Sequence, residues 1–228
     1  MFMKWVIKIT GDINKLRAEI DEVDKKIIEL ILKRMEIVHQ VGLTKSKNKT
    51  RVYVPEREVA IYKRLSSFSN LSPKDIQSFY TEIISFCRKL EGILNVGVKA
   101  DSISLLGVKK LFGEYVNPIF FNTFNELDLT STKYILSKFS KDMLDFLLEN
   151  NWHVINKTEI QGETLYLFSF YENSILKDDD IAVILSKEIL STNSIKIENN
   201  HYINFLSANM IEQVKDLDIK ILGFIPYI

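Results

Sequence analysis

The sequence has 228 residues, of which 46% are hydrophobic, and its 30 lysine and arginine residues balance its 30 aspartate and glutamate residues. A chain of this length can form one large or two small packed domains, and zero net charge gives no global attraction to nucleic acid or to an anionic membrane. Any anion-binding site must therefore be local. The single cysteine excludes an intrachain disulfide and a cysteine-rich metal site, and it fits a reducing cytoplasm.

The start of the chain predicts an extension and then one long helix. Residues 1–11 are too short and too rich in lysine for a signal-peptide core or a membrane span, so we expect an N-terminal extension. From Ile13 onward, apolar residues recur at intervals of three and four, which indicates a helix that ends between Lys47 and Arg51.

Two shorter helices are expected next. Pro55 suits the first turn of a helix that runs to about Phe68, and Ser72 followed by Pro73 opens another. All three helices are amphipathic and cannot bury every apolar face alone. We therefore predict an all-helical domain over residues 12–92 that forms a homodimer.

The second half of the chain has a different residue composition and pattern, which predict an α/β or α+β region. Helices are expected at 105–112, 141–149 and 179–190. Segments rich in β-forming residues predict strands at 95–99, 117–122, 133–137, 152–155, 165–171, 194–198, 202–206 and 219–224.

Two cations interrupt the apolar stripe of the long helix. Continuing the spacing beyond Leu30 brings positions 34, 37, 41 and 45 to the interior, and two of these are Arg34 and Lys45. They are separated by about 16 Å of helical rise with an angular offset of only about 20°, so both could hold one small anion. Alternatively, both reach solvent or pair with acids on neighbouring helices.

The shorter helices add carboxylates and a further cation to the same interior. The apolar stripe of the third helix runs on to Glu91, and Glu58, with Arg57 beside it, shares a side of the second helix with apolar residues. Several ionisable groups that converge in one interior are expensive as pure structure, and a polar ligand would offset this cost. The sequence offers no nucleophile–base arrangement, glycine-rich phosphate loop or metal-ligand cluster, so electrostatic catalysis on an anion remains.

Five segments resemble the all-helical chorismate mutases, especially those fused to prephenate dehydratase. The resemblance covers about residues 12–92, and the identity, order and spacing of the motifs all agree. The segments are Leu16-Arg17-Ala18-Glu19-Ile20-Asp21-Glu22-Val23-Asp24, Lys33-Arg34-Met35, Val41-Gly42-Leu43-Thr44-Lys45, Tyr53-Val54-Pro55-Glu56-Arg57-Glu58 and Glu82-Ile83-Ile84-Ser85-Phe86-Cys87-Arg88-Lys89-Leu90-Glu91.

The resemblance implies a substrate, chorismate, and a set of residues that bind it without metal or cofactor. Arg34 and Lys45 are expected to bind its carboxylates, with Lys45 also near the ether oxygen. Arg57 helps to order the site, and Glu58 accepts a hydrogen bond from the ring hydroxyl. Cys87 occupies a position where the family often has a small hydroxyl residue or alanine, and we expect it to be a small core residue beside the substrate.

Arg17 is expected to enter the site of the partner subunit, as it does in this family. It lies about 25 Å along the helix from Arg34 and about 100° around it, so the two cannot touch one small molecule within a single chain. A dimer of intertwined long helices follows.

The implied reaction is the rearrangement of chorismate to prephenate in aromatic amino-acid biosynthesis. Arginines orient the two carboxylates, and donors at the ether oxygen stabilise the negative charge that gathers there in the transition state. Glu91 can donate to this oxygen only when protonated, so its role as a catalytic residue, with Lys45 and Arg34, requires a raised pKa.

The second half resembles degenerate parts of the same fusion proteins. Residues 93–163 share short motifs with a prephenate dehydratase domain but lack its glycines and its Thr-Arg-Phe signature, so we expect no dehydratase activity. Residues 164–228 can be read as strand, helix, strand, strand, helix, strand, similar to a ferredoxin-like ACT regulatory domain. An amino-acid effector of this region and a simple dimer-stabilising role both remain open.

Two other functions are consistent with the sequence. An isochorismate pyruvate lyase shares the helical fold, and a non-catalytic helical protein could bind an aromatic-pathway metabolite or regulate a partner enzyme. The intact set of charged residues argues against a decayed site. A purely structural coiled coil is excluded because Arg34 and Lys45 interrupt the stripe that it needs.

Overall fold

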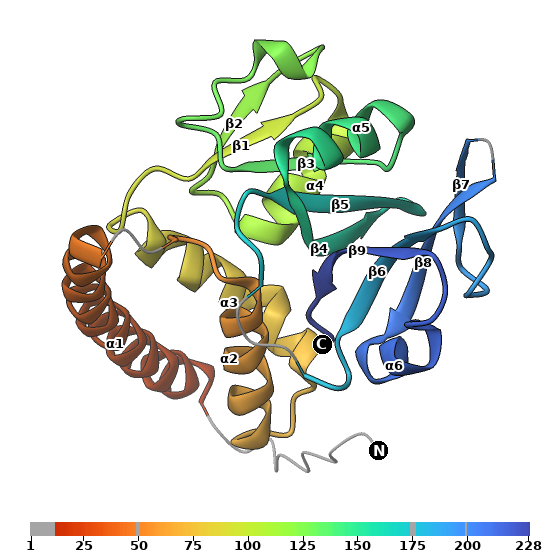
Figure 1. Ribbon diagram of the computed structural model, residues 1–228. Helices are drawn as coiled ribbons and strands as arrows, with labels where there is room; N and C mark the ends of the chain where they lie inside the picture. The colour runs from red at the N-terminus through yellow and green to blue at the C-terminus, as the bar shows by residue number, and fades with distance from the viewer. Residues whose placement is uncertain (1–11, 49–50, 174–176, 199) are drawn as a thin grey trace.

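The chain forms three helices followed by one large mixed sheet (Figure 1). The computed structural model describes residues 12–48, 51–173, 177–198 and 200–228, and it describes the side chains of the first helix as far as Thr44. The extension expected at residues 1–11 lies outside this part of the chain. The helices are α1 (Ile13–Asn48), α2 (Pro55–Ser67) and α3 (Pro73–Arg88).

The ends of the helices follow from local chemistry. Asp12 accepts a hydrogen bond from the backbone N–H of Asn14 (3.0 Å) at the start of α1, and Pro55 begins α2, where no helical N–H partner is needed. Ser72 and Asp75 form a reciprocal capping box at the start of α3. The predicted ends of the first two helices are confirmed.

Only the C-terminal part of α1 packs against the rest of the chain. All residues from Asp12 to Leu30 are exposed, whereas Gly42 is buried near the end of α3. The exposed apolar side chains of α1 include Leu16, Ile20 and Val23, each more than 40% accessible. No helix among the described residues combines the length and the apolar character that a bilayer span requires.

The remaining elements form a nine-stranded sheet in the order β2-β1-β3-β5-β4-β9-β6-β8-β7. Strand β1 pairs in parallel with β2 and β3, β4 pairs in parallel with β9, and the other pairs are antiparallel. The elements are β1 (Asn95–Val98), α4 (Ser102–Phe112), β2 (Asn117–Phe120), η1 (Phe124–Glu126), β3 (Tyr134–Ser137), α5 (Lys141–Asn150), β4 (His153–Ile160), β5 (Glu163–Ser169), β6 (Ile181–Ser186), β7 (Ile195–Glu198), β8 (His201–Ser207), η2 (Ala208–Met210), α6 (Ile211–Val214) and β9 (Ile219–Ile225).

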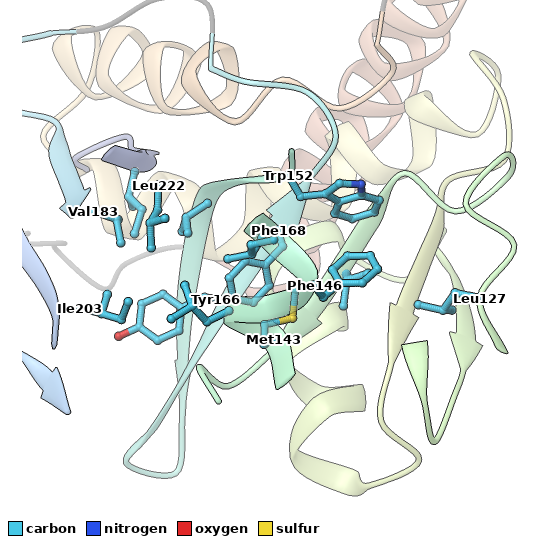
Figure 2. Close-up of a cluster of buried hydrophobic side chains, with 14 of the residues drawn as sticks. Leu127, Met143, Phe146, Trp152, Tyr166, Phe168, Val183, Ile203 and Leu222 are labelled. Carbon is cyan, nitrogen blue, oxygen red and sulfur yellow. The ribbon is translucent and has the colours of Figure 1, made fainter. Parts of the chain in front are cut away.

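Helices α4 and α5 cover opposite faces of the sheet, because alternate residues of each strand point to opposite sides. In β3, Ile135 joins the core with α5, whereas Leu136 joins the core with α4. Figure 2 shows the first of these cores, with Met143 and Phe146 of α5 close to strand side chains such as Phe168. The second core also includes Tyr53, which precedes α2, so the sheet region and the helical part share packed residues.

One expected helix is wrong. The segment predicted as helix 179–190 contains β6, a central strand between β8 and β9. Its sequence Ile-Ala-Val-Ile-Leu is a short apolar run that is largely buried, and such runs lack the periodicity that separates strand from helix. The expected element order of residues 164–228 is therefore also wrong at its first helix.

The expected boundary at residues 163 and 164 falls at the start of β5, which pairs with β4 in a hairpin. The sheet is continuous from β2 to β7 across this position. The division of the chain at residues 92 and 163 into separate domains stays a prediction.

Candidate active site

A small cavity lies where the C-terminal part of α1 meets α2 and α3. Its volume is about 80 Å³. Ligand pockets are typically about 300–1,000 Å³, so a small molecule can bind here only if side chains move. The lining residues come from all three helices and the segments beside them: Arg34, Val38, Val41, Val52, Val54, Arg57, Glu58, Ile61, Ile84, Cys87, Arg88 and Glu91.

Arg34 carries a buried donor that lacks a hydrogen-bond partner. Its Nη1 atom is buried and has no hydrogen bond to any described residue, and its guanidinium carbon lies 5.7 Å from the centre of the Tyr80 ring. A buried donor left unpaired costs free energy, and a charged one costs more. The position of Arg34 is therefore suited to an anionic ligand.

Glu58 is the acidic centre of the cavity wall. Its Oε1 atom accepts a hydrogen bond from Nη2 of Arg88, and its Oε2 atom accepts one from the Tyr62 hydroxyl (3.3 Å), which is also 3.1 Å from Oγ1 of Thr81. Burial raises the pKa of the Glu58 carboxyl, and Arg88 acts against this rise.

Arg57 and Cys87 also line this cavity. Arg57 follows Glu56 on α2 and is exposed, so its side chain is free of the packing that fixes Glu58. Cys87 is only 1% accessible and is a free thiol. Its size leaves space at the cavity wall that a larger side chain would fill.

Glu91 lies against α1 rather than within α3. The third helix ends at Arg88, three residues earlier than its predicted stripe, and Glu91 lies in the following turn before Gly92, which has a φ of +143°. A Cβ atom on Gly42 would lie only 3.1 Å from the Glu91 Cα, so this glycine permits the close approach. Glu91 is half-buried and lines the cavity.

Arg17 and Lys45, two of the predicted site residues, are not among the described residues that line the cavity. Arg17 is exposed on the N-terminal half of α1 and does not line the cavity. Lys45 belongs to α1, but its side chain lies outside the described residues. The structure therefore brings Arg34, Arg57, Glu58, Cys87 and Glu91 together, and the placement of the other two stays a prediction.

Arg88 is a cavity residue that the sequence analysis missed. It is 3% accessible and binds both Glu58 and the backbone carbonyl oxygen of Phe112. Its spacing of four residues from the buried Ile84 was a usable signal, because a charge at such a position interrupts the buried face of α3.

The described cavity wall has a positive charge balance, with three arginines against two glutamates. Because Arg88 and Glu58 pair with each other, Arg34 and Arg57 are the cations left to meet an anionic ligand. Within the described chain, no group of three or more His, Cys, Asp and Glu side chains is arranged to hold a metal ion. A larger cavity of about 940 Å³ lies over the sheet and contains none of the predicted site residues.

The residues that line the cavity lie within a segment that matches a known family. Residues 16–92 match the family model of chorismate mutase type II. The bifunctional chorismate mutase/prephenate dehydratase of Aquifex aeolicus (strain VF5) is 31% identical over 107 residues, which cover 44% of this chain and 28% of that protein.

Two T-proteins are also similar. Those of Haemophilus influenzae (strain ATCC 51907 / DSM 11121 / KW20 / Rd) and Enterobacter agglomerans are 48% and 42% identical over 46 and 53 residues. These segments cover 20% and 23% of this chain and 12% and 14% of the two proteins, so the chain spans only a minor part of its curated relatives. No solved structure matches the chain significantly. The helical N-terminal part of the chain thus matches the chorismate mutase type II family over residues 16–92.

Proposed function

We propose that this protein is a chorismate mutase that rearranges chorismate to prephenate in the phenylalanine and tyrosine branch of aromatic amino-acid biosynthesis. The observation that carries the proposal is the cavity in which Arg34, Arg57, Glu58 and Glu91 converge within the segment that matches the mutase family. Arg34 and Arg57, which form no ion pair with Glu58 among the described residues, suit a dicarboxylate. An enzyme of this pathway is expected in the cytoplasm.

In the proposed site, Arg34 and Lys45 bind the two substrate carboxylates, and Arg57 helps to order them. The unpaired Nη1 of Arg34 supports its part, because a carboxylate oxygen would supply the missing acceptor. Glu58 accepts the hydrogen bond of the ring hydroxyl, and Cys87 leaves room for the ring.

The chemistry requires orientation and charge stabilisation. The carboxylate-binding residues hold chorismate in a compact shape in which the bond-forming carbon atoms are close. As the C–O bond breaks, the ether oxygen becomes more negative, and hydrogen bonds donated by Lys45 and Glu91 stabilise this charge more than they stabilise the bound substrate.

The active form is a homodimer in which Arg17 of each chain completes the site of the other. The exposed apolar face of α1 supports this part of the proposal, because Leu16, Ile20 and Val23 have no cover within the described chain. The apolar cluster between α2 and α3 is also small: among the described residues, only Tyr62, Ile76 and Ile84 are buried together in it. A second copy of α1 would cover these surfaces and bring Arg17 across.

An amino-acid effector at the C-terminal region is a further part of the proposal. The cavity of about 940 Å³ over the sheet has an aromatic lining in which Phe139, Tyr166 and Phe205 lie together, with Lys138 and Lys157 beside them. Such a lining suits an apolar molecule that carries a carboxylate. Inhibition by phenylalanine or tyrosine, lost on Phe205→Ala, would support this part, and unchanged kinetics with either amino acid would remove it.

The full chain and its Arg34→Ala variant provide the test. We expect purified protein to consume chorismate, followed by its absorbance, and to yield prephenate, which acid then converts to phenylpyruvate. Phenylpyruvate formed without acid would show an active dehydratase. Salicylate and pyruvate formed from isochorismate, without consumption of chorismate, would favour the lyase, and consumption of neither substrate would favour a binding protein.

A further inference from the structure

Arg88 connects the cavity wall to the C-terminal half of the chain. Its Nη2 atom donates to Oε1 of Glu58, and its Nη1 atom donates to the carbonyl oxygen of Phe112 (3.2 Å), the last residue of α4. The guanidinium group therefore spans from the mutase helices to the sheet region. None of the roles proposed above uses this residue.

Aromatic rings hold the guanidinium group in place. Its carbon atom lies 5.3 Å from the centre of the Tyr53 ring and 6.0 Å from that of Phe112. Tyr53 is itself fixed by the sheet, since its hydroxyl accepts a hydrogen bond from Asn156 (2.8 Å) and its carbonyl accepts one from Tyr134 (3.2 Å). The position of Arg88 is thus determined largely by residues outside the mutase helices.

Stability alone gives no reason for a buried ion pair at this point. Replacing such a pair by apolar residues of similar volume is often neutral or stabilising, because both charges lose their hydration on burial. Here Glu58 also lines the cavity, where a fixed acceptor is useful. We propose that Arg88 is a positioning residue of the mutase site: anchored on the C-terminal half, it holds the Glu58 carboxylate in one orientation at the cavity wall.

This inference rests on the proposed function, because it is in chorismate binding that Glu58 acts as the acceptor. Burial raises the pKa of Glu58, and Arg88 opposes that rise, so removing Arg88 leaves the carboxyl protonated to higher pH. Among the described residues, the other titratable or charged groups near Glu58 or in its cavity are Arg34 of α1, Arg57 and Tyr62 of α2, Cys87 of α3, Tyr53 of the loop before α2 and Glu91 of the turn after α3.

The first experiment needs no enzyme activity. In the full chain labelled with ¹³C at the glutamate side-chain carboxyl, the Glu58 resonance is identified by its loss in Glu58→Gln. We expect its titration midpoint to move to higher pH in Arg88→Met and to return toward the wild-type value in Arg88→Lys, which restores a cation. An unchanged midpoint in a folded Arg88→Met protein would overturn the inference.

The second experiment measures kcat/KM for chorismate against pH. On the acidic side of this profile (the acid limb), kcat/KM should fall as Glu58 becomes protonated. Arg88→Met should move this limb to higher pH, together with the Glu58 titration. Arg88→Lys should leave that limb in place but lower kcat/KM about tenfold, because one ammonium group cannot reproduce the fork that joins Glu58 to Phe112. In a Glu58→Gln background, either Arg88 change should cost little further activity. Wild-type kcat/KM in Arg88→Lys, or fully additive losses in this cycle, would contradict a positioning role.

A pair of glycine variants tests the anchor without touching the ion pair. Gly113, with a φ of +74°, follows Phe112, and a Cβ atom there would lie 2.5 Å from the Ser85 Cβ of α3, so Gly113→Ala must shift the end of α4 relative to α3. Gly162, with a φ of +82° and open space around it, imposes a similar backbone strain elsewhere. We expect Gly113→Ala to lower kcat/KM and shift the acid limb, and Gly162→Ala to do neither.

The outcomes separate the two proposals. If the Glu58 titration responds to Arg88 but the wild-type protein converts no chorismate, the proposed function fails and the hold of Arg88 on Glu58 stands. If chorismate is converted but the Glu58 titration and the acid limb are the same in the wild-type protein and in Arg88→Met, the positioning role fails. If Gly113→Ala and Gly162→Ala have the same kcat/KM and the same pH profile, the C-terminal half does not anchor Arg88.

Discussion

A charge placed on the exposed apolar face of α1 should separate the proposed dimer. Ile20 is 57% accessible in the single chain and lies in a stretch, Asp12 to Leu30, that is exposed throughout. Burial of an isoleucine or leucine side chain contributes about 1.5–3 kcal/mol. A two-fold interface contains each residue twice, so Ile20→Glu should cost about 3–6 kcal/mol, or roughly a hundred- to ten-thousand-fold in the dimer dissociation constant.

Sedimentation velocity over a nanomolar to micromolar range measures this constant directly. Ile189→Glu is the matched control, since Ile189 is 64% accessible but lies beyond β6, far along the chain from α1. We expect the control to keep the wild-type dissociation constant and Ile20→Glu to be monomeric at micromolar concentration, with its mutase activity lost in parallel. A monomeric wild-type protein, or equal constants for both variants, would refute the reasoning.

Three further changes probe the cavity itself. Arg34→Ala should lower kcat/KM by about 10²–10³ with little change in thermal stability, because the lost donor is unpaired in the free protein; a loss below tenfold would remove Arg34 from the site. Glu91→Gln should keep mutase activity, since an amide also donates a hydrogen bond, whereas Glu91→Ala should lower kcat/KM by about 10²–10³, and equal activity of the two variants would exclude Glu91 as the donor. Gly42→Ala should lower the melting temperature and kcat/KM together, because its Cβ atom would lie 3.1 Å from the Glu91 Cα. The overpacking should cost about 1–3 kcal/mol in the free energy of unfolding. A wild-type melting temperature and a wild-type kcat/KM would show that α1 and the turn at Glu91 can move apart at no cost.

The helical part of the fold could be predicted closely because its signals are local. The long apolar periodicity, Pro55 and the pair Ser72-Pro73 locate three helices without reference to the rest of the chain. Eight of the nine strands described in the second half were also predicted from their composition. Strand β6 was not, because a buried central strand is apolar on both faces and its five-residue run has no distinguishing period.

The candidate site shows the same limit at the level of single residues. Arg34, Glu58 and Glu91 could be found because each interrupts or extends the apolar stripe of its own helix. Arg88 depends on Phe112, 24 positions further along, and on the ring of Tyr53, and these contacts exist only after the sheet has packed against the helices. Its role could not be derived from the pattern of α3 alone.

Complementation between two inactive variants tests most directly whether one site is built from two chains. In Arg17→Ala and Arg34→Ala homodimers, every site lacks one arginine, whereas a mixed dimer has one site with both and one with neither. Random pairing after co-expression in equal amounts makes about half of the dimers mixed, so we expect about a quarter of wild-type mutase activity per site. Activity no higher than that of the two parent variants would contradict a site shared between subunits around one dicarboxylate.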